Sequence, residues 1–498
     1  MAVPTEAKRR VGAGGEALKQ VRAWALTLAA AAVAVSACKR EEPKQAPDSL
    51  AALEAEWPPH TPTCKAWTAE ELGELEPLPA GPHVAAFEYV WRTIAEKHYD
   101  PTLACLDWVA LREHYGKQVA EAGTDAAAAY AAINEMLGLL EQSHLHASAP
   151  SGATVPAREG GPATVPIVVR WLQVERGADR RAVVVVDEAV DGHSSGLPRG
   201  AIVTRIAGES VDEIAEQAAA AVRERGGRAS EAAFMVARAV GAMLSCPAGG
   251  NKTIEFLDPG KDDARAELEV ACLLPEGERM SLGNLRDLPT VVKSSLIGEQ
   301  PAIGYLAFNF WMLPMAPQIE AGLAGLRERG MAGLVIDLRG NPGGVGSMSI
   351  PIARMLVSEG ASLGRLQMRE FNQEFKVAPN PDAFAGPLAI LVDEGTASTS
   401  EIFALGMRDI GRVTIVGAGP SAGMALPSMI EELPDGGMIQ YVVGDYRSGK
   451  GTVAEGEGVV PELMVVETRT DYAAGRDPVL DAAVEHLRGK LDAALAAD

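Results

Sequence analysis

The chain has 498 residues, which is long enough for two or three domains. Hydrophobic residues make up 47% of it and charged residues 22%, so it can bury a core and is not a disordered protein. With 45 Lys and Arg against 67 Asp and Glu, the formal net charge is −22, and no block rich in Lys and Arg interrupts the acidic background. This charge pattern argues against nucleic acid as a partner.

The first 37 residues have the pattern of an export signal. Basic residues precede an apolar stretch at 23–35, which has the length of a signal-peptide core and is too short to span a bilayer. Residues 35–38 then resemble a bacterial lipobox, in which the cysteine is lipidated and becomes the mature N-terminus. We therefore expect a membrane protein that is lipid-anchored at Cys38 in the cell envelope and faces the periplasm; simple secretion and a retained anchor are the alternatives. Residues 38–64, rich in Pro, Glu and Lys near their start, are expected to form a tether.

The number of cysteines is compatible with an oxidising compartment. Apart from Cys38, four cysteines remain, and none has the spacing of a CxxC motif or of zinc ligands. Four cysteines allow three pairings. The local pairing joins Cys64 to Cys105 and Cys246 to Cys272, within two regions that other patterns also separate; four unpaired buried thiols are the alternative.

Three regions follow the tether. Apolar residues recur at helical spacing within residues 65–150, which predicts a helical N-terminal part. Residues 160–290 contain short β-rich runs, a helical Ala-rich insert at about 211–243 and a hairpin around 258–260. These features are typical of a PDZ-like domain, although the segment is longer than a minimal PDZ domain. In residues 300–498, strands alternate with helices, which predicts an α/β sheet with covered faces. The strands are expected at 303–308, 333–338, 388–392 and 413–416, and one helix at about 399–409.

Two turns in the third region follow buried strands, where α/β folds place their active sites. In the first turn, Gly343 and Gly344 would let backbone N–H groups face a substrate without an intervening Cβ; a tight structural turn is the alternative. In the second, small residues at 395–400 lead from a strand into the helix. Ser398 or Ser400 would project its hydroxyl over the helix N-terminus, or would only cap the helix.

Together these segments resemble family S41 of the serine peptidases, the C-terminal processing or tail-specific proteases. The resemblance rests on the sequence Asp-Leu-Arg-Gly-Asn-Pro-Gly-Gly at 337–344 and on the turn at 395–401, which occupies the place of the family's nucleophile turn. It implies a crotonase-like (ClpP/crotonase) α/β core with a helical N-terminal part and an inserted PDZ-like domain. It also implies that Ser398 is the nucleophile and that no metal or organic cofactor is needed.

The base differs from that of the better-known branch of the family. That branch carries a Lys in a Gly-Lys-Gly turn one strand after the nucleophile, and here Gly423 stands where this Lys would fall. Lys450 lies in a similar tripeptide, but its surroundings match a later hairpin turn of the family. We therefore interpret Lys450 as a solvated lysine in a turn.

The pair Ser143-His144 resembles that of the tricorn-like branch, which uses a Ser-His-Ser-Glu tetrad with Glu455 at the position of its carboxylate. By this resemblance, His144 would take the hydroxyl proton of Ser398, and Glu455 would orient His144 directly or through Ser143. An imidazole with its ordinary pKa predicts that kcat/KM falls as the pH drops through 6 to 7. His146 is a rival for the role of His144.

Acyl transfer also needs two donors to the oxyanion. By resemblance these are the backbone N–H of Thr399 and that of either Gly343 or Gly344, and Glu401 is interpreted as a carboxylate near the helix N-terminus. The implied activity is that of a serine endopeptidase, which hydrolyses a polypeptide substrate through an acyl-enzyme. A non-catalytic binding lipoprotein on the same scaffold is the alternative. Acyl-CoA chemistry of the crotonase type conflicts with the export signal.

Overall fold

The computed structural model describes residues 58, 61, 63–68, 70–73, 75–150, 163–175, 181–190, 193–224, 227–282 and 285–496. The predicted signal peptide, the lipidation residue Cys38 and most of the predicted tether lie outside these residues. Residues 55–498 belong to one compact unit. In the described ranges, no helix combines the length and the apolar character needed to cross a membrane.

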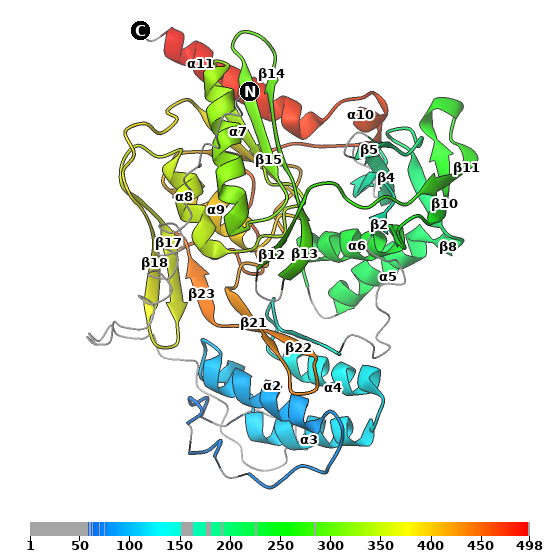
Figure 1. Ribbon diagram of the computed structural model, residues 1–498, viewed down its shortest axis with the longest axis vertical. Helices are drawn as coiled ribbons and strands as arrows, with labels where there is room; N and C mark the ends of the chain where they lie inside the picture. Colours follow the sequence, from blue (N-terminus) through cyan, green and yellow to red (C-terminus); the bar gives the residue numbers. More distant parts are fainter. Residues whose placement is uncertain are drawn as a thin grey trace, which may run out of the picture. The chain divides into compact units, whose positions relative to one another are not determined.

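The helical N-terminal part packs three helices around aromatic side chains. They are α2 (Val84–Lys97), α3 (Trp108–Glu121) and α4 (Ala126–Gly138), with a short 3-10 helix, η1 (Leu103–Cys105), between the first two. Asp107 and Asp125 cap α3 and α4 by accepting N–H bonds from the first helical turn. The indole N–H of Trp91 donates to the carbonyl oxygen of Trp108 (2.7 Å), and that of Trp108 donates to the carbonyl of Trp91 (3.0 Å). This buried pair joins α2 to α3 (Figure 1).

Each of the two disulfides joins one cysteine to the next cysteine in the sequence. Cys64 pairs with Cys105, which ties the segment before α2 to η1. Cys246 pairs with Cys272 inside the region predicted to be PDZ-like. The first disulfide therefore joins the last residue of the predicted tether to the helical part, and the second lies within one predicted region.

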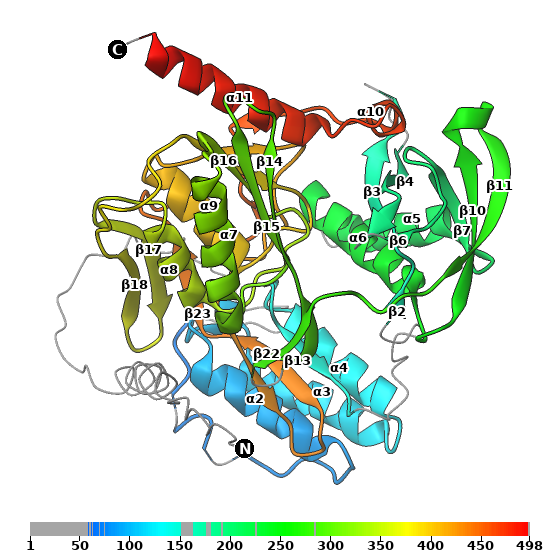
Figure 2. The same cartoon turned by 45° about the horizontal axis from the view of Figure 1, so that its top comes forward.

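The region predicted to be PDZ-like is built on an antiparallel sheet with the strand order β11-β10-β7-β4-β3. Its strands are β3 (Val168–Gln173), β4 (Arg181–Asp187), β7 (Ile202–Ile206), β10 (Asn251–Asp258) and β11 (Ala264–Ala271), with β8 (Glu209–Ser210) beside β7. Two helices, α5 (Val211–Glu224) and α6 (Ala229–Leu244), pack apolar side chains on this sheet (Figure 2). Short pairs join β2 (Ala163–Thr164) to β9 (Ser245–Cys246) and β5 (Ala189–Val190) to β6 (His193–Ser194).

The core is a six-stranded sheet with the order β14-β15-β16-β19-β20-β24. Its strands are β14 (Val292–Ile297), β15 (Ile303–Phe308), β16 (Gly333–Asp337), β19 (Leu388–Val392), β20 (Thr414–Gly417) and β24 (Leu463–Met464). β14 runs antiparallel to β15, and the other neighbours are parallel. Every residue of β16 and β19 is buried, because helices cover both faces of the sheet (Figures 1 and 2).

The helices of the core divide between the two faces of this sheet. The first face is covered by α7 (Ala316–Glu328), α8 (Ser349–Arg354) and α9 (Thr399–Asp409), and the second by α11 (Pro478–Leu495). Further elements are α10 (Arg469–Ala473), η2 (Pro259–Lys261), η3 (Leu313–Met315), η4 (Gly346–Met348) and a sheet of β17 (Ala361–Met368), β18 (Asn372–Val377) and β23 (Gly444–Arg447).

Two segments pack differently from what the predicted domain boundaries imply. β14 begins before residue 300, so the core sheet starts earlier than predicted. The hairpin of β12 (Glu278–Leu282) and β13 (Leu285–Thr290), predicted as part of the PDZ-like domain, forms a sheet of its own. Its Met280 packs in the hydrophobic cluster beneath the core sheet. Strand patterns in a sequence do not show which sheet a strand joins. For this reason the predicted boundary between the second region and the core differs from the observed one.

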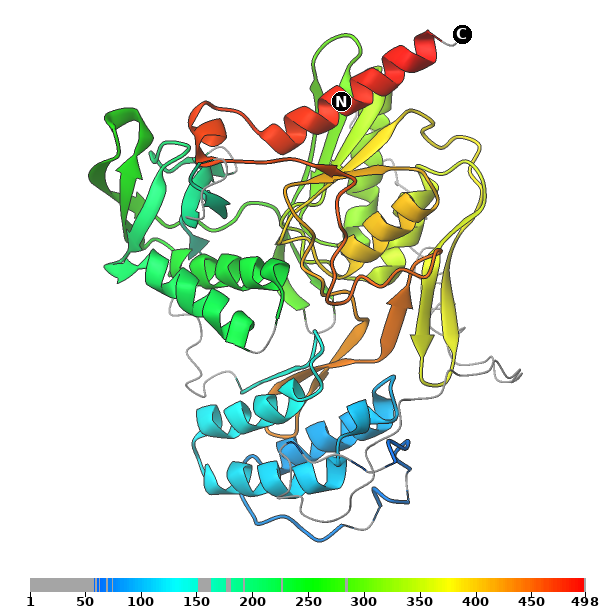
Figure 3. The same cartoon turned by 180° about the vertical axis from the view of Figure 1, so that it is seen from behind.

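A hairpin of the third region completes the helical part. β21 (Ser428–Glu432) and β22 (Met438–Val442) form a three-stranded sheet with β1 (His146–Ser148). Leu433, Ile439 and Tyr441 of this hairpin are buried among the aromatic side chains of α2 to α4, and Figure 3 shows the hairpin beside these helices. Since β1 begins two residues after His144, this pairing brings the predicted base to the third region.

Candidate active site

Ser398 lies in the turn that connects β19 to α9, after the carboxyl end of a central parallel strand. It is the N-cap residue of α9, but its backbone has φ 55° and ψ −120°. N-cap residues typically have dihedrals in the β region, so helix capping alone does not require this conformation. Strained dihedrals at residues other than glycine cluster at functional sites. The turn therefore holds Ser398 in a way that its role as a cap does not explain.

The glycine turn after β16 packs directly against this serine. A Cβ on Gly343 would lie 2.7 Å from the Cβ of Ser398 and 2.9 Å from the backbone nitrogen of Thr399. A Cβ on Gly344, which has φ 143°, would lie 2.4 Å from the carbonyl oxygen of Trp311. Both positions need glycine, because a side chain would collide with neighbouring backbone. The two turns that the sequence singled out are thus in contact.

The two glycines differ in whether their N–H groups already have a partner. The N–H of Gly343 donates to Oδ1 of Asn341 (3.0 Å), a fully buried side chain whose Nδ2 donates to the carbonyl oxygen of Phe308 (2.7 Å). Across the described ranges, the N–H groups of Gly344 and Thr399 have no hydrogen-bond partner. Gly344 and Thr399 therefore offer two available donors beside Ser398.

Ser143, His144 and Glu455 are brought together from distant parts of the sequence. Ser143 Oγ lies 2.7 Å from His144 Nδ1 and 2.9 Å from Glu455 Oε2. The backbone N–H of Ser143 donates to Glu455 Oε1 (2.9 Å), and that of Ala425 donates to Glu455 Oε2 (2.8 Å). An ionised carboxylate only accepts, so Ser143 gives its hydroxyl hydrogen to Glu455 and accepts Nδ1–H from His144. This assignment leaves a lone pair on Nε2 of the imidazole.

Burial changes the pKa of both titratable groups in this chain of contacts. It lowers the pKa of the half-buried His144 to about 4, so the imidazole is neutral at physiological pH and can accept a proton. Burial also raises the pKa of Glu455, and the hydrogen bonds from Ser143 and Ala425 oppose that rise. The range of 6 to 7 predicted for an ordinary imidazole is therefore too high for His144, because the sequence does not reveal its burial.

Both Ser398 and the carboxylate of Glu455 contact one segment, residues 421–426. The N–H of Ser398 donates to the carbonyl oxygen of Met424 (2.8 Å), and the next residue, Ala425, donates to Glu455. Among the described contacts, no hydrogen bond joins His144 to Ser398 itself. Catalytic hydrogen bonds are often long in free enzymes and tighten in the complex with substrate.

The two rival bases lie outside this network. His146 is exposed in β1, where it pairs with β22. Lys450 is exposed in the turn after β23, and its backbone N–H donates to Asp409 (3.1 Å). The prediction that Lys450 is a solvated turn residue is therefore confirmed.

Two residues at the site were missed by the sequence reasoning. Asn341 holds the glycine turn through the bonds described above, and its place inside the motif at 337–344 is a signal that could have identified it. Ser421 is completely buried, and its hydroxyl donates to Glu401. Only the tertiary contact reveals this role, because Ser421 lies 20 residues after its partner.

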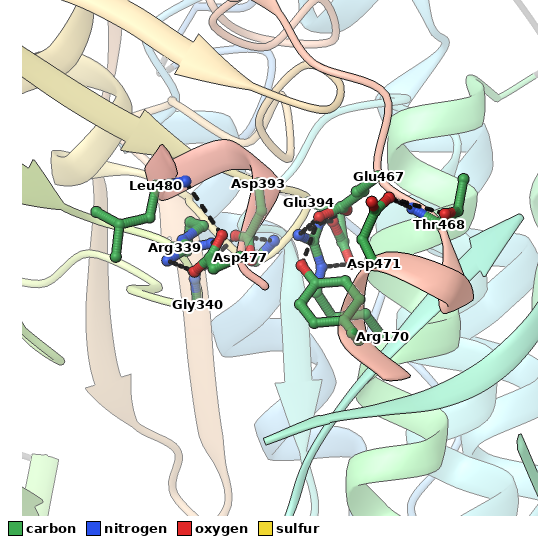
Figure 4. A network of polar contacts seen from close by, with 12 residues as sticks. Arg170, Arg339, Gly340, Asp393, Glu394, Glu467, Thr468, Asp471, Asp477 and Leu480 are labelled. Atoms are coloured by element: carbon green, nitrogen blue, oxygen red, sulfur yellow. Dashed lines mark hydrogen bonds and ion pairs between the residues drawn. The ribbon is translucent and has the colours of Figure 1, made fainter. Parts of the chain in front are cut away.

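A buried ionic network holds the start of the glycine turn (Figure 4). Arg339 pairs with Asp337 (2.7 Å) and with Asp477 (2.8 Å), so the motif is tied to the start of α11. The N–H of Gly340 donates to Asp393 Oδ1 (2.8 Å), next to the nucleophile turn. The bond of Gly340 to Asp393 thus joins the two turns at a second point besides Gly343.

Arg170 of β3 extends this network. It pairs with Glu394, four residues before Ser398, and with Glu467 (2.7 Å). The hydroxyl of Tyr472 also donates to Glu467 (2.7 Å). The Arg170 side chain is buried between two carboxylates, so β3 is firmly attached to the residues that lead into the nucleophile turn.

Comparison with known proteins decides the family. Residues 302–465 match peptidase family S41, and residues 84–138 match the C1 domain of tricorn protease. This chain carries an S41 peptidase domain at residues 302–465. It is therefore a serine peptidase, and the α/β core with a helical N-terminal part is the fold expected from the sequence.

Individual relatives agree with this assignment. A carboxyl-terminal-processing protease of Synechocystis sp. is 25% identical over 394 residues, which cover 78% of this chain and 82% of that protein. The carboxy-terminal processing protease CtpA of Bacillus subtilis is 26% identical over 230 residues, which cover 45% and 46% of the two chains.

Solved structures are similar in fold. The photosystem II D1 C-terminal processing protease superposes with a TM-score of 0.51 at 21% identity, over 78% of this chain and 94% of that one. Mature CPAF complexed with lactacystin superposes with a TM-score of 0.53 at 14% identity, over 82% and 97% of the two chains. At these identities the similarity supports the fold class of this S41 peptidase.

Proposed function

We propose that this S41 peptidase is an endopeptidase with Ser398 as its nucleophile and His144 as its base. The observation that carries the proposal is the chain of contacts from Glu455 through Ser143 to His144, which joins residues 312 positions apart. Such a chain gives a base its tautomer and orientation, as the buried carboxylate does in a Ser-His-Asp triad.

The reaction follows from these positions. Nε2 of His144 takes the hydroxyl proton of Ser398 while Oγ attacks the substrate carbonyl carbon. The contact of Nδ1 with Ser143, which in turn donates to Glu455, stabilises the imidazolium. The N–H groups of Thr399 and Gly344 donate to the oxyanion. His144 then gives the proton to the leaving amine as the C–N bond breaks, which leaves an acyl-enzyme. A water molecule, deprotonated by the same imidazole, hydrolyses this ester.

The substrate we propose is a polypeptide, bound near its C-terminal tail with help from the PDZ-like part. The names of the relatives, which are carboxyl-terminal processing proteases, support this substrate class. We also propose that the protein is anchored through a lipid on Cys38 and faces the periplasm. The lipobox-like residues 35–38 and the two disulfides favour this location, since disulfides persist in oxidising compartments.

Labelling with a fluorophosphonate probe tests the proposal against a non-catalytic binding protein. This reagent reacts with activated serine hydroxyls, so we expect it to label the wild type at Ser398 and to leave Ser398→Ala unlabelled. His144→Ala should label far more slowly, while Lys450→Ala should label like the wild type. A wild-type protein that binds peptides but neither reacts with the probe nor cleaves them would support the binding alternative instead.

A further inference from the structure

A second carboxylate lies directly beneath the nucleophile. Glu401 is the third residue of α9, and its side chain is completely buried. Oε2 accepts the N–H groups of Ser398 (2.9 Å) and Met424 (3.0 Å), and Oε1 accepts the N–H of Gly423 (2.8 Å) and the hydroxyl of Ser421. Within the described part of the chain, no Lys, Arg or His side chain forms an ion pair with this carboxylate.

The hydrogen-bond partners of Glu401 suit the ionised carboxylate, whereas its burial favours the acid. Ser421 Oγ accepts the N–H of Val459 (2.6 Å), so its own hydrogen is free to point at Glu401. All four neighbours of the carboxylate are then donors. A proton on Glu401 would need an acceptor, and it would displace one of these donors.

The donors of Glu401 do not belong to its helix alone. A first-turn carboxylate that only caps a helix bonds to the backbone N–H of the N-cap residue, as Glu401 does with Ser398. Here two consecutive amides of another segment, those of Gly423 and Met424, also donate to Glu401. The amide of the next residue, Ala425, donates to Glu455, which holds the loop of the base. One short segment is thus held by two carboxylates, one on the side of the nucleophile and one on the side of the base.

We propose that Glu401 is a positioning residue whose ionised carboxylate aligns Ser398 with His144 by holding the nucleophile turn to residues 421–424. This inference rests on the proposed function, because it assigns Ser398 and His144 their roles. It also agrees with the backbone of Ser398, which at φ 55° directs its N–H between the carboxylate of Glu401 and the carbonyl oxygen of Met424. Glu401 is thus a carboxylate at the helix N-terminus, as the sequence predicts, and it also aligns the catalytic residues.

The pH dependence of this alignment differs from that of the base. Burial raises the pKa of Glu401 to about 7, and the four hydrogen bonds oppose the rise. The groups that face it come from the N-cap of α9 and from residues 421–424, and none of them is titratable. Since His144 has a pKa of about 4, the loss of activity on acidification is expected near pH 7 and is set by Glu401.

Steady-state kinetics on one peptide substrate across pH 4 to 9 tests the inference. Glu401→Gln should lower kcat about 100-fold with KM within a few-fold, since misplacing a reacting group by about 1 Å costs that much. It should also abolish the acid limb near pH 7. Ser421→Ala should move this limb to higher pH, because the ionised carboxylate loses one hydrogen bond. The exposed Glu374→Gln on β18 is the matched control and should leave both the rate and the limb unchanged.

The outcomes separate this inference from the proposed function. If activity is lost near pH 7 in Glu401→Gln as it is in the wild type, the positioning role is overturned. If Glu401→Gln fails to fold, an unchanged pH dependence in Ser421→Ala overturns it. The roles of Ser398 and His144 would then still stand, provided that their alanine variants are inactive. A wild-type enzyme in which Ser398 is unreactive towards the fluorophosphonate would instead contradict the proposed function itself.

Discussion

Gly343 approaches Ser398 so closely that a Cβ on the glycine would lie 2.7 Å from the Cβ of the serine. The same Cβ would lie 2.8 Å from the carbonyl oxygen of Ala397 and 2.9 Å from the nitrogen of Thr399, so the collision involves backbone that cannot rotate away. The glycine turn and the nucleophile turn therefore act as one rigid unit, whose spacing depends on the absence of a side chain.

This contact predicts that Gly343→Ala disrupts catalysis. Moving the two turns apart would shift Ser398 relative to its oxyanion donors, and kcat should fall by about 100-fold or more. Gly325→Ala on α7 is the control, because a Cβ there meets nothing within 4 Å. Peptide hydrolysis and thermal unfolding are to be measured together. Full activity in Gly343→Ala would show that the turns can separate without consequence.

Substitution of the proposed catalytic residues should give non-additive losses. Ser398→Ala and His144→Ala should each lower kcat by about 10⁴- to 10⁶-fold, and the double variant should be little worse, because the two residues act as a unit. Glu455→Gln should lose less, since the carboxylate orients and stabilises the base. Lys450→Ala should stay within a few-fold of the wild type. If His144→Ala kept its peptidase activity and Lys450→Ala lost it, a Ser-Lys mechanism would replace the one proposed.

The buried carboxylate should make folding stability depend on pH. Glu401 has a pKa of about 7 in the folded protein against an ordinary value of 4.5, so between these values the folded state binds more proton than the unfolded state. Its contribution to stability is therefore lost as the pH rises, by at most about 1.4 kcal/mol per pH unit. The free energy of unfolding of the wild type relative to Glu401→Gln should fall between pH 5 and pH 7, as urea titrations at several pH values would measure. A difference that does not change with pH would contradict the raised pKa.

Both disulfides should contribute to stability. Removing Cys64–Cys105 with a double Ser variant should cost about 2 to 4 kcal/mol of unfolding free energy, mainly because the unfolded chain gains freedom. The same range applies to Cys246–Cys272. Non-reducing peptide mapping of the purified protein checks the pairing first. Free thiols or crossed pairs would refute the assignment.

The lipobox-like residues predict that Cys38 carries the membrane anchor. Cells that express the protein and are fed a palmitate analogue should incorporate it into the wild type, while Cys38→Ala should remain unprocessed or unlabelled. The Cys64→Ser variant serves as the matched cysteine control and should be labelled normally. Undiminished label in Cys38→Ala would exclude this anchor.

Local patterns were sufficient for the elements of the core. The strands at 303–308 and 388–392 and the helix at 399–409 have the bounds that the sequence predicts. Buried parallel strands appear as continuous apolar runs, and the small-residue turn marks the helix start, so both signals lie within a few neighbouring residues. The partners of β12 and β13 could not be predicted in this way, because pairing joins segments that are distant along the chain.

The sequence by itself determined the identity of the two turns, the family that they indicate and the residues Ser398, His144 and Glu455 as candidates. Only the tertiary structure decided that Ser143 links His144 to Glu455, that Gly344 and not Gly343 has an available N–H, and that Glu401 is buried among donors. The physical reason is the range of the interactions involved. Turn residues and apolar runs act between near neighbours, whereas burial, hydrogen-bond partners and pKa depend on segments that meet only when the chain has folded.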